Sequence, residues 1–231
     1  PADARAQELL AEAGRSGRRL CDADVVEVLA LWNFRRNDKR TNVMREGTTF
    51  VLSEMLGLVR IRAYNKMTAA RQTMLYPNVT RMLCQFLVDN PPEGLQGGER
   101  FPFTTICLNK DYAAARHRDV NNVGLSIIRA FGEFEGGRLR HWPGDPGRRA
   151  VPDPAGLEDG AAEVAAVRGR SVVVNSVCAH EVEPFSGTRY SLVYFSIPGF
   201  QKCNDVVRAR LRDTCGLELP TLAGANGVWS Q

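Results

Sequence analysis

The sequence predicts an α+β protein with a jelly-roll core, a double-stranded β-helix flanked by N-terminal helices. Three observations predict this: helical periodicity in the first hundred residues, short alternating apolar segments from Phe101 onward, and Gly-, Pro- and Asp-rich turns between those segments. A chain of 231 residues can bury one sizeable core. We therefore expect one domain over 1–231, with a mostly helical support region at 1–100, the jelly roll at 101–200 and a tail at 201–231.

The composition narrows the class of protein. A hydrophobic content of 44% with 24% charged residues is typical of globular chains. No apolar run is long enough to span a bilayer and no signal peptide opens the sequence, so we expect no membrane association. The six cysteines are irregularly spaced without a Cys-X-X-Cys pair, which favours reduced thiols over disulfides or zinc. The net charge of +4 is compatible with a polyanionic partner.

Four segments have helical character. Residues 1–20 are rich in Ala, Arg and Glu without a sustained apolar stripe, so a peripheral helix is expected there. A second helix is expected from Asp24, with Asp24 as its cap and Glu27 three residues later. A third begins at Pro77, and its apolar residues recur at helical spacing. A short amphipathic helix is expected at 205–211.

Alternating apolar residues predict the strands. We expect strands at 59–64, 103–109, 123–131, 137–142, 163–167, 171–177 and 189–197. The insertion Pro143–Gly160 is rich in Pro, Gly, Asp and Arg, which predicts a mobile loop. Its charged residues are expected to be solvated: Asp145, Arg148 and Arg149.

A His-X-Asp pair, His117 and Asp119, lies between two predicted strands. In extended backbone, residues two apart point to the same side, so this imidazole and carboxylate can bind one metal ion while Arg118 points elsewhere. The chain has three histidines, and His180, at the end of an apolar run, is a better third ligand than His141. Two His and one carboxylate are the ligand set of non-haem Fe(II) oxygenases.

An arginine follows the third histidine at a useful position. Arg189 lies on the predicted strand 189–197, nine residues after His180. Its planar guanidinium can bind the remote carboxylate of a keto acid through two parallel hydrogen bonds. The hydroxyl of Ser191, on the same strand face, can add another bond.

These motifs carry a resemblance. The segments HRDVNN, GEFEGGRL and AHEVEPFSGTRYSLVYF resemble the core of Fe(II)/2-oxoglutarate-dependent dioxygenases, and HRDVNN and RYSLVYF are similar to the TET/JBP enzymes, which oxidise 5-methylcytosine or thymine in nucleic acid. The likeness covers roughly residues 100–197. The Cys-rich zinc-binding region of the large animal enzymes is missing, so the chain looks like a compact protist, algal or fungal member.

The resemblance implies roles for individual residues. His117, Asp119 and His180 are implied to bind Fe(II) at the catalytic centre, with Arg189 and Ser191 binding 2-oxoglutarate. One of two asparagines is implied to contact the ligands, Asn121 at the cosubstrate or Asn122 at the nucleic acid. An algal relative uses ascorbate, which leaves ascorbate as an alternative cosubstrate.

The implied activity is oxidation of the methyl group of 5-methylcytosine or thymine, in DNA or RNA. The target base must then be flipped out of a duplex, which requires phosphate contacts and a stacking surface. Candidates for the phosphates are a basic loop with Arg35, Arg36, Lys39 and Arg40, and candidates for stacking are Trp142 and Tyr64. A solvated surface is an equally good interpretation of the loop, and packing is the better one for Trp142.

Two alternatives remain open from the sequence. The same iron chemistry could act on a protein or small molecule, or the chain could be an inactive cupin-like binding module, against which the intact ligand set argues. With DNA as the target, a monomer in the nucleus is expected.

Overall fold

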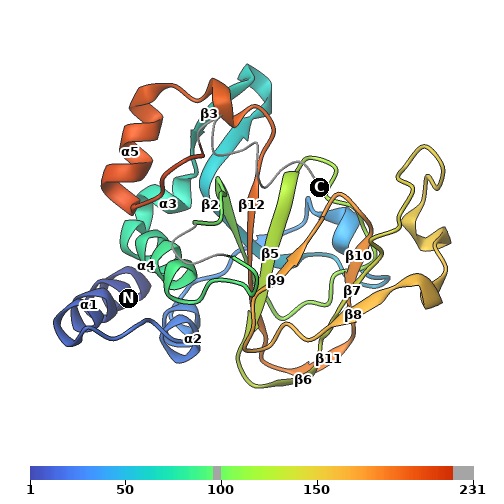
Figure 1. Ribbon diagram of the computed structural model, residues 1–231, viewed down its shortest axis with the longest axis horizontal. Coiled ribbons are helices and arrows are strands. Elements are labelled where there is room, and N and C mark those ends of the chain that lie inside the picture. Colours follow the sequence, from blue (N-terminus) through green and yellow to red (C-terminus); the bar gives the residue numbers. More distant parts are fainter. Residues whose placement is uncertain (96–99, 221–231) are drawn as a thin grey trace.

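A computed structural model describes residues 1–95 and 100–220 of the chain. Two antiparallel sheets face each other, with helices over the outer side of the larger one (Figure 1). The part of the predicted tail at 221–231 lies outside the described residues.

The larger sheet has the strand order β1-β2-β4-β12-β5-β9, and β3 pairs with the far half of β2. Its strands are β1 (Arg36–Asn37), β2 (Val51–Ile61), β3 (Lys66–Ala69), β4 (Thr105–Lys110), β5 (Val123–Phe131), β9 (Val172–Val174) and β12 (Tyr190–Ser196).

The smaller sheet has the order β10-β7-β8, and an antiparallel bridge between His117 and His180 adds a further edge to it. Its strands are β7 (Leu139–His141), β8 (Glu163–Ala165) and β10 (His180–Val182). A separate two-stranded ribbon is formed by β6 (Phe134–Gly136) and β11 (Phe185–Gly187).

The chain passes repeatedly between the two sheets. It runs from β4 to the His117 segment, back to β5, across to β7 and β8, back to β9, across to β10, and returns on β12. This alternation, with β12 between β4 and β5, is the double-stranded β-helix, and the predicted fold class is confirmed.

Helices cover the outer face of the larger sheet. They are α1 (Ala2–Ser16), α2 (Asp22–Ala30), α3 (Arg71–Leu75), α4 (Pro77–Asp89) and α5 (Asp205–Cys215). Short 3-10 turns occur at Thr41–Val43, Arg62–Tyr64, Pro154–Gly156, Asp159–Ala161 and Phe200–Lys202. The apolar stripe predicted for α4 is buried against the sheet, and the hydroxyl of Tyr194 on β12 donates to the carbonyl of Leu83 at 2.9 Å.

Two helix predictions need correction. Residues 2–16 are not peripheral, because one face of this helix is buried against α4. The buried residues are Ala2, Ala6, Leu9 and Ala13. Alanines supply much of that stripe, which made it hard to recognise. The second helix begins at Asp22 rather than beyond Asp24, and the Asp24 carboxylate accepts from the backbone N–H of Cys21 at 2.8 Å. Asp24 is thus the third residue of the capping box instead of the cap.

One longer strand replaces the strand expected at 59–64. The strand β2 continues from Val51 to Ile61, and 62–64 is a 3-10 turn rather than its end. Gly57 has φ +88°, and a Cβ there would lie 2.4 Å from the carbonyl oxygen of Thr104. At this glycine β2 stops pairing with β4 and begins pairing with β3. The region 1–100 therefore contributes strands as well as helices.

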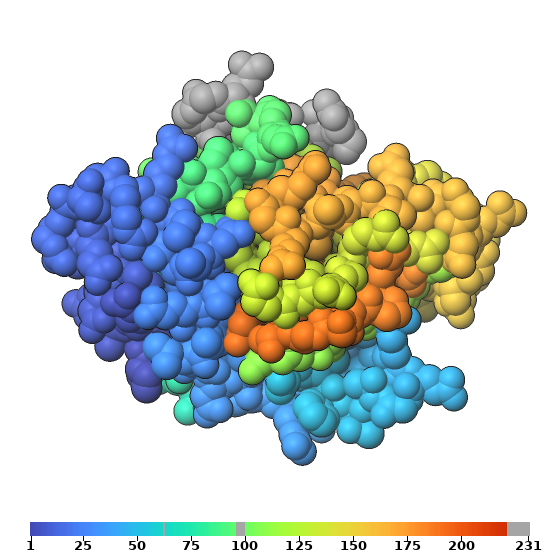
Figure 2. All heavy atoms as spheres, turned by 90° about the horizontal axis from the view of Figure 1, so that it is seen from below, coloured from blue at the N-terminus to red at the C-terminus, as the bar shows by residue number. Residues whose placement is uncertain are grey.

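The insertion at 143–160 projects beside the smaller sheet, on the side away from the N-terminal helices (Figures 1 and 2). Arg148 and Arg149 are exposed as predicted, but Asp145 is not solvated. Its carboxylate has no exposed surface and pairs with Arg118. Among the described residues, no helix combines the length and apolarity needed to cross a membrane. All six cysteines are free thiols.

Candidate metal centre and cavity

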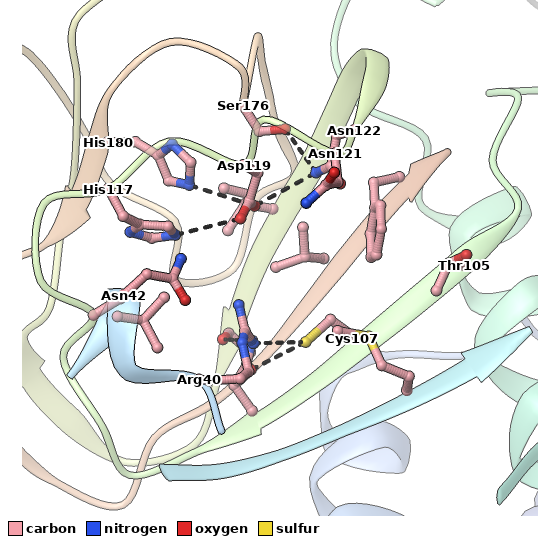
Figure 3. Close-up of a pocket in the computed structure, with 18 of the residues that line it drawn as sticks. Arg40, Asn42, Thr105, Cys107, His117, Asp119, Asn121, Asn122, Ser176 and His180 are labelled. Carbon is pink, nitrogen blue, oxygen red and sulfur yellow. Dashed lines mark hydrogen bonds and ion pairs between the residues drawn. The ribbon is translucent and has the colours of Figure 1, made fainter. Parts of the chain in front are cut away.

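The fold brings His117, Asp119 and His180 together. The backbones of His117 and His180 exchange two hydrogen bonds, of 3.0 and 2.9 Å, so both imidazoles project from one end of the smaller sheet. Asp119 follows two residues after His117 and faces both rings (Figure 3). Its carboxylate oxygens lie 3.7 Å from His117 Nε2 and 3.8 Å from His180 Nε2. One ligand atom from each residue lies within 4.8 Å of the others, a spacing that one metal ion can bridge.

Backbone carbonyls orient both rings. His117 Nδ1 lies 2.7 Å from the carbonyl oxygen of Ala115, and His180 Nδ1 lies 3.0 Å from that of Cys178. A proton on each Nδ1 leaves each Nε2 lone pair directed at the shared space, as a metal ligand requires. Burial, and next the neighbouring His180, lower the pKa of His117 to about 4. The ring is therefore neutral at pH 7 and ready to bind a cation.

A chain of hydrogen bonds supports the carboxylate. The backbone N–H of Asp119 donates to the carbonyl of Ser176 at 2.9 Å. The side-chain amide of Asn122 donates to Ser176 Oγ at 2.9 Å and lies 3.4 Å from Asp119 Oδ2. The hydroxyl of Ser176 in turn meets that of Ser126 at 2.9 Å. Asn122, which we predicted at the nucleic acid, lies beside the candidate metal ligand Asp119.

The triad opens into a cavity of about 810 Å³ along the inner face of the larger sheet. Alternate residues of the β12 segment line it, from Arg189 through Ser191, Val193 and Phe195 to Ile197. The register places Ser191 beside Asn109, and Val193 beside Cys107 and Ile128. The cavity therefore has a polar row near Arg189 and an apolar row next to it, in the direction of Ile197.

Arg189 is a buried cation without an anion. Its residue is 3% exposed, its Nε has no hydrogen-bond partner, and no carboxylate pairs with it among the described residues. The guanidinium lies over the rings of Phe134 and Phe185, at 5.4 and 5.5 Å from their centroids. Burial lowers its pKa to about 10. Such a group stays costly until an anion reaches it, so this end of the cavity is built for a carboxylate.

Arg40 lies in the cavity instead of on the surface of the basic loop. It faces the triad across the cavity (Figure 3). Its guanidinium donates to Ser53 Oγ at 2.9 Å and to the hydroxyl of Tyr112 at 3.3 Å, with Cys107 Sγ at 3.4 Å. Nothing in the run of cations distinguishes Arg40 from its neighbours, so the sequence could not single it out.

The other predicted nucleic-acid contacts are spread over the molecule. Arg35, Arg36 and Lys39 are exposed, and β1 places them beside the start of β2. Asn121 is exposed and contributes to the cavity lining. Tyr64 is 80% exposed, at the turn between β2 and β3.

Trp142 cannot serve as a stacking surface, and this prediction was wrong. It is 1% exposed, and its indole N–H donates to the carbonyl of Glu158 at 2.8 Å. The guanidinium groups of Arg116 and Arg140 lie over its ring at 4.0 and 5.1 Å. The packing interpretation of Trp142 is therefore the right one.

Three polar residues around the site were not predicted from the sequence. Tyr112 donates to Asn109 Oδ1 at 2.7 Å, Asn109 donates to Ser191 Oγ at 3.3 Å, and Ser176 supports Asp119 and Asn122. Asn109 and Tyr112 precede His117 by eight and five residues, so their closeness in sequence was the available signal. Ser176 lies on a distant segment and gave none.

No family model and no curated protein matches this chain. Among solved structures, a 2OG-Fe(II) oxygenase family oxidoreductase from Burkholderia pseudomallei shares 19% identity over 75% of this chain and 78% of its own, with a TM-score of 0.44. NgTET1 in complex with 5mC DNA shares 13% over 64% and 61%, with a TM-score of 0.40. A Pseudomonas putida prolyl-4-hydroxylase shares 18% over 84% and 87%, with a TM-score of 0.35.

The fold assignment rests on the strand order of the chain itself, and the site on its own ligand atoms. Two imidazoles and one carboxylate are the donors that Fe(II) takes in non-haem oxygenases. The Arg189 guanidinium donates to the carbonyl of Gly137 at 3.4 Å, but its Nε has no partner, and with the hydroxyl of Ser191 in the same lining it matches the remote carboxylate of a keto acid. The residues present therefore fit Fe(II) and 2-oxoglutarate, bound in one cavity of a double-stranded β-helix.

Proposed function

We propose that this protein is an Fe(II)/2-oxoglutarate-dependent dioxygenase that oxidises the methyl group of a 5-methylpyrimidine, 5-methylcytosine or thymine, in DNA. The observation that carries the oxygenase proposal is the buried, unpaired Arg189 in the same cavity as the His117, Asp119 and His180 ligand atoms. The choice of a methylated base is supported by the likeness of HRDVNN and RYSLVYF to the TET/JBP enzymes.

Each part of the cavity has a task in this reaction. Bound iron, with 2-oxoglutarate and dioxygen, supplies the oxidant, converting a methyl to a hydroxymethyl group while 2-oxoglutarate yields succinate and carbon dioxide. Arg189 and Ser191 hold the remote carboxylate of the cosubstrate. The row of Val193, Cys107 and Ile128 offers a largely apolar surface for a methyl group.

The cavity also has room for a base beside the cosubstrate, since its volume of about 810 Å³ lies in the range of ligand sites that enclose drug-sized molecules. A buried iron cannot reach a stacked base, so the target must be flipped or single-stranded. The proposal includes a monomer that acts in the nucleus on DNA.

Mass spectrometry of nucleosides tests the proposal. An oligonucleotide with 5-methylcytosine is incubated with the protein, Fe(II), dioxygen and either 2-oxoglutarate or ascorbate, with His180→Ala as the matched control. Hydroxymethyl, formyl or carboxyl cytosine formed only with 2-oxoglutarate, with equimolar succinate at the first step, is the expected result. A heavier adduct formed with ascorbate alone would show that ascorbate, and not 2-oxoglutarate, is the cosubstrate. If no methylated base is turned over, the proposed substrate is wrong.

A further inference from the structure

A second hollow adjoins the cavity at its far end from Arg189. It has a volume of about 500 Å³ and is formed by the β2–β3 turn and the turn after β12. Arg60 and Pro198 line both spaces, so the two are neighbours. Alternate residues of the β12 segment lead from buried Arg189 to half-buried Ile197 and Pro198 and so towards this hollow. This outer hollow therefore lies beside the end of the cavity that is far from Arg189.

All the charged side chains that line this hollow are positive. Its lining contains three exposed cations, Arg60, Lys66 and Lys202, and no carboxylate. None of the three forms an ion pair with any residue in 1–95 or 100–220. Elsewhere the exposed arginines often pair, as Arg138 does with Glu183 and Arg168 with Glu133. Three unpaired cations around one concavity attract a polyanion.

An aromatic ring stands among these cations. Tyr64, at the turn between β2 and β3, is 80% exposed and lines the same hollow. The turn is held by Arg60, whose Nε donates to Asn65 Oδ1 at 2.9 Å. Asn65 has φ +48°, which closes the turn tightly. A ring this exposed contributes little to the core, and beside cations it offers a face for a nucleobase.

We propose that this hollow is a binding groove for a nucleic-acid strand, in which Lys66, Lys202 and Arg60 contact phosphates and Tyr64 stacks on a base next to the one in the cavity. The inference rests on the proposed function and deepens it, because it gives the strand a path to the triad. An acidic protein segment would also meet the charge of the hollow, but it would make no use of the exposed ring.

The groove differs from the surface expected from the sequence. Arg35, Arg36 and Lys39 lie beside Leu52, at the opposite end of β2 from Arg60. Eight residues of strand separate Leu52 from Arg60, which corresponds to about 26 Å. The proposed phosphate contacts are therefore on the turn that borders the outer hollow, and not on the basic loop.

Fluorescence anisotropy with a labelled twelve-nucleotide single strand containing 5-methylcytosine tests the groove. The variants are Lys66→Ala with Lys202→Ala, Tyr64→Ala, and Tyr64→Trp. The control is Arg148→Ala with Arg149→Ala, which removes the same charge from the exposed loop at 143–160. All positions are exposed, so melting temperatures are expected to match the wild type. Binding of 2-oxoglutarate with Co(II), measured by calorimetry, should also be unchanged.

The double lysine variant is expected to reduce the magnitude of the slope of log K against log salt by roughly 1.4, since each lost phosphate contact on a single strand removes about 0.7. Tyr64→Ala is expected to weaken binding about tenfold without changing that slope. Tyr64→Trp is expected to bind with wild-type affinity. Affinities equal to those of the Arg148 and Arg149 control would overturn the groove. So would a poly-glutamate peptide that competes equally well in wild type and Tyr64→Ala.

The failure of the groove can be distinguished from the failure of the proposed function. If the groove variants lose DNA affinity but no methylated base is ever oxidised, the groove stands and the proposed reaction falls. If bases are oxidised and the variants bind DNA like the wild type, the reaction stands and the groove falls.

Discussion

Arg118 and Asp145 form a two-pronged ion pair behind the metal ligands, with N–O distances of 2.6 and 2.7 Å. Arg118 lies between His117 and Asp119 in sequence, and the Asp145 carboxylate also accepts from the backbone N–H of Ala179, next to His180, at 2.7 Å. One buried ion pair thus ties together the two segments that carry the metal ligands. Arg118 points away from the metal ligands as expected, and this orientation lets it pair with Asp145.

Breaking this pair from one side should therefore affect both stability and metal binding. Asp145→Asn leaves the enclosed Arg118 cation without its partner, and we expect a loss on the order of 3 kcal/mol in the free energy of unfolding. Affinity for Co(II) should fall about tenfold or more, because the supports of metal ligands matter nearly as much as the ligands. Urea unfolding and metal titration measure the two effects. An unchanged Co(II) affinity would show that the pair is only structural.

Arg189→Met should separate binding from stability. We expect 2-oxoglutarate binding, measured by calorimetry with Co(II), to be lost, since Arg40, another cation in the cavity lining, already donates to Ser53 and Tyr112. Without ligands, the same variant should be as stable as the wild type or more stable by about 1 kcal/mol, because it removes a buried charge that has no anion. Arg189→Lys serves as the control and should bind at least tenfold more weakly than the wild type. Wild-type 2-oxoglutarate affinity in Arg189→Met would refute this assignment of the anchor.

Ser176→Ala should weaken metal binding without touching a ligand. The hydroxyl of Ser176 accepts from the Asn122 amide and meets Ser126, and its loss frees Asn122 to move away from Asp119. We expect about tenfold lower Co(II) affinity and an altered visible spectrum of the Co(II) complex. Thr80→Ala removes a buried hydroxyl in α4, far from the site, and is the matched control. Equal metal affinities in the two variants would contradict the supporting role.

The pH dependence of stability tests the buried imidazole. In the metal-free protein the pKa of His117 is about 4, below the ordinary 6.5, because burial disfavours the charged ring. Between these values the unfolded chain binds a proton that the folded chain does not, so the free energy of unfolding falls as pH decreases from 6.5 to 4. The loss is on the order of 3 kcal/mol. His117→Gln should flatten this part of the curve, and an unchanged slope would assign it to other groups.

Most residues of the site could be predicted from the sequence, because the alternation of side chains along a strand is a local pattern. Two-residue spacing on one side of extended backbone accounts for His117 with Asp119 and for Arg189 with Ser191. Arg40 could not be placed, because its position depends on contacts with Ser53 and Tyr112 from other elements. Asp145 and Trp142 read as ordinary loop and strand-end residues, and only tertiary packing shows one beneath the metal ligands and the other between two arginines. The jelly-roll prediction succeeded since its turns and alternating segments are sequence-local signals.

The strand β12 is hydrogen-bonded along its length to β4 on one side and β5 on the other. It therefore forms a firmly held wall of the cavity. The eight-residue interval from Arg189 to Ile197 spans about 26 Å. In the proposed reaction, that interval sets how far a substrate must extend from the outer hollow towards Arg189. Engineered changes in substrate specificity should then come from replacing the side chains at Val193, Phe195 and Ile197, which line the cavity along this strand.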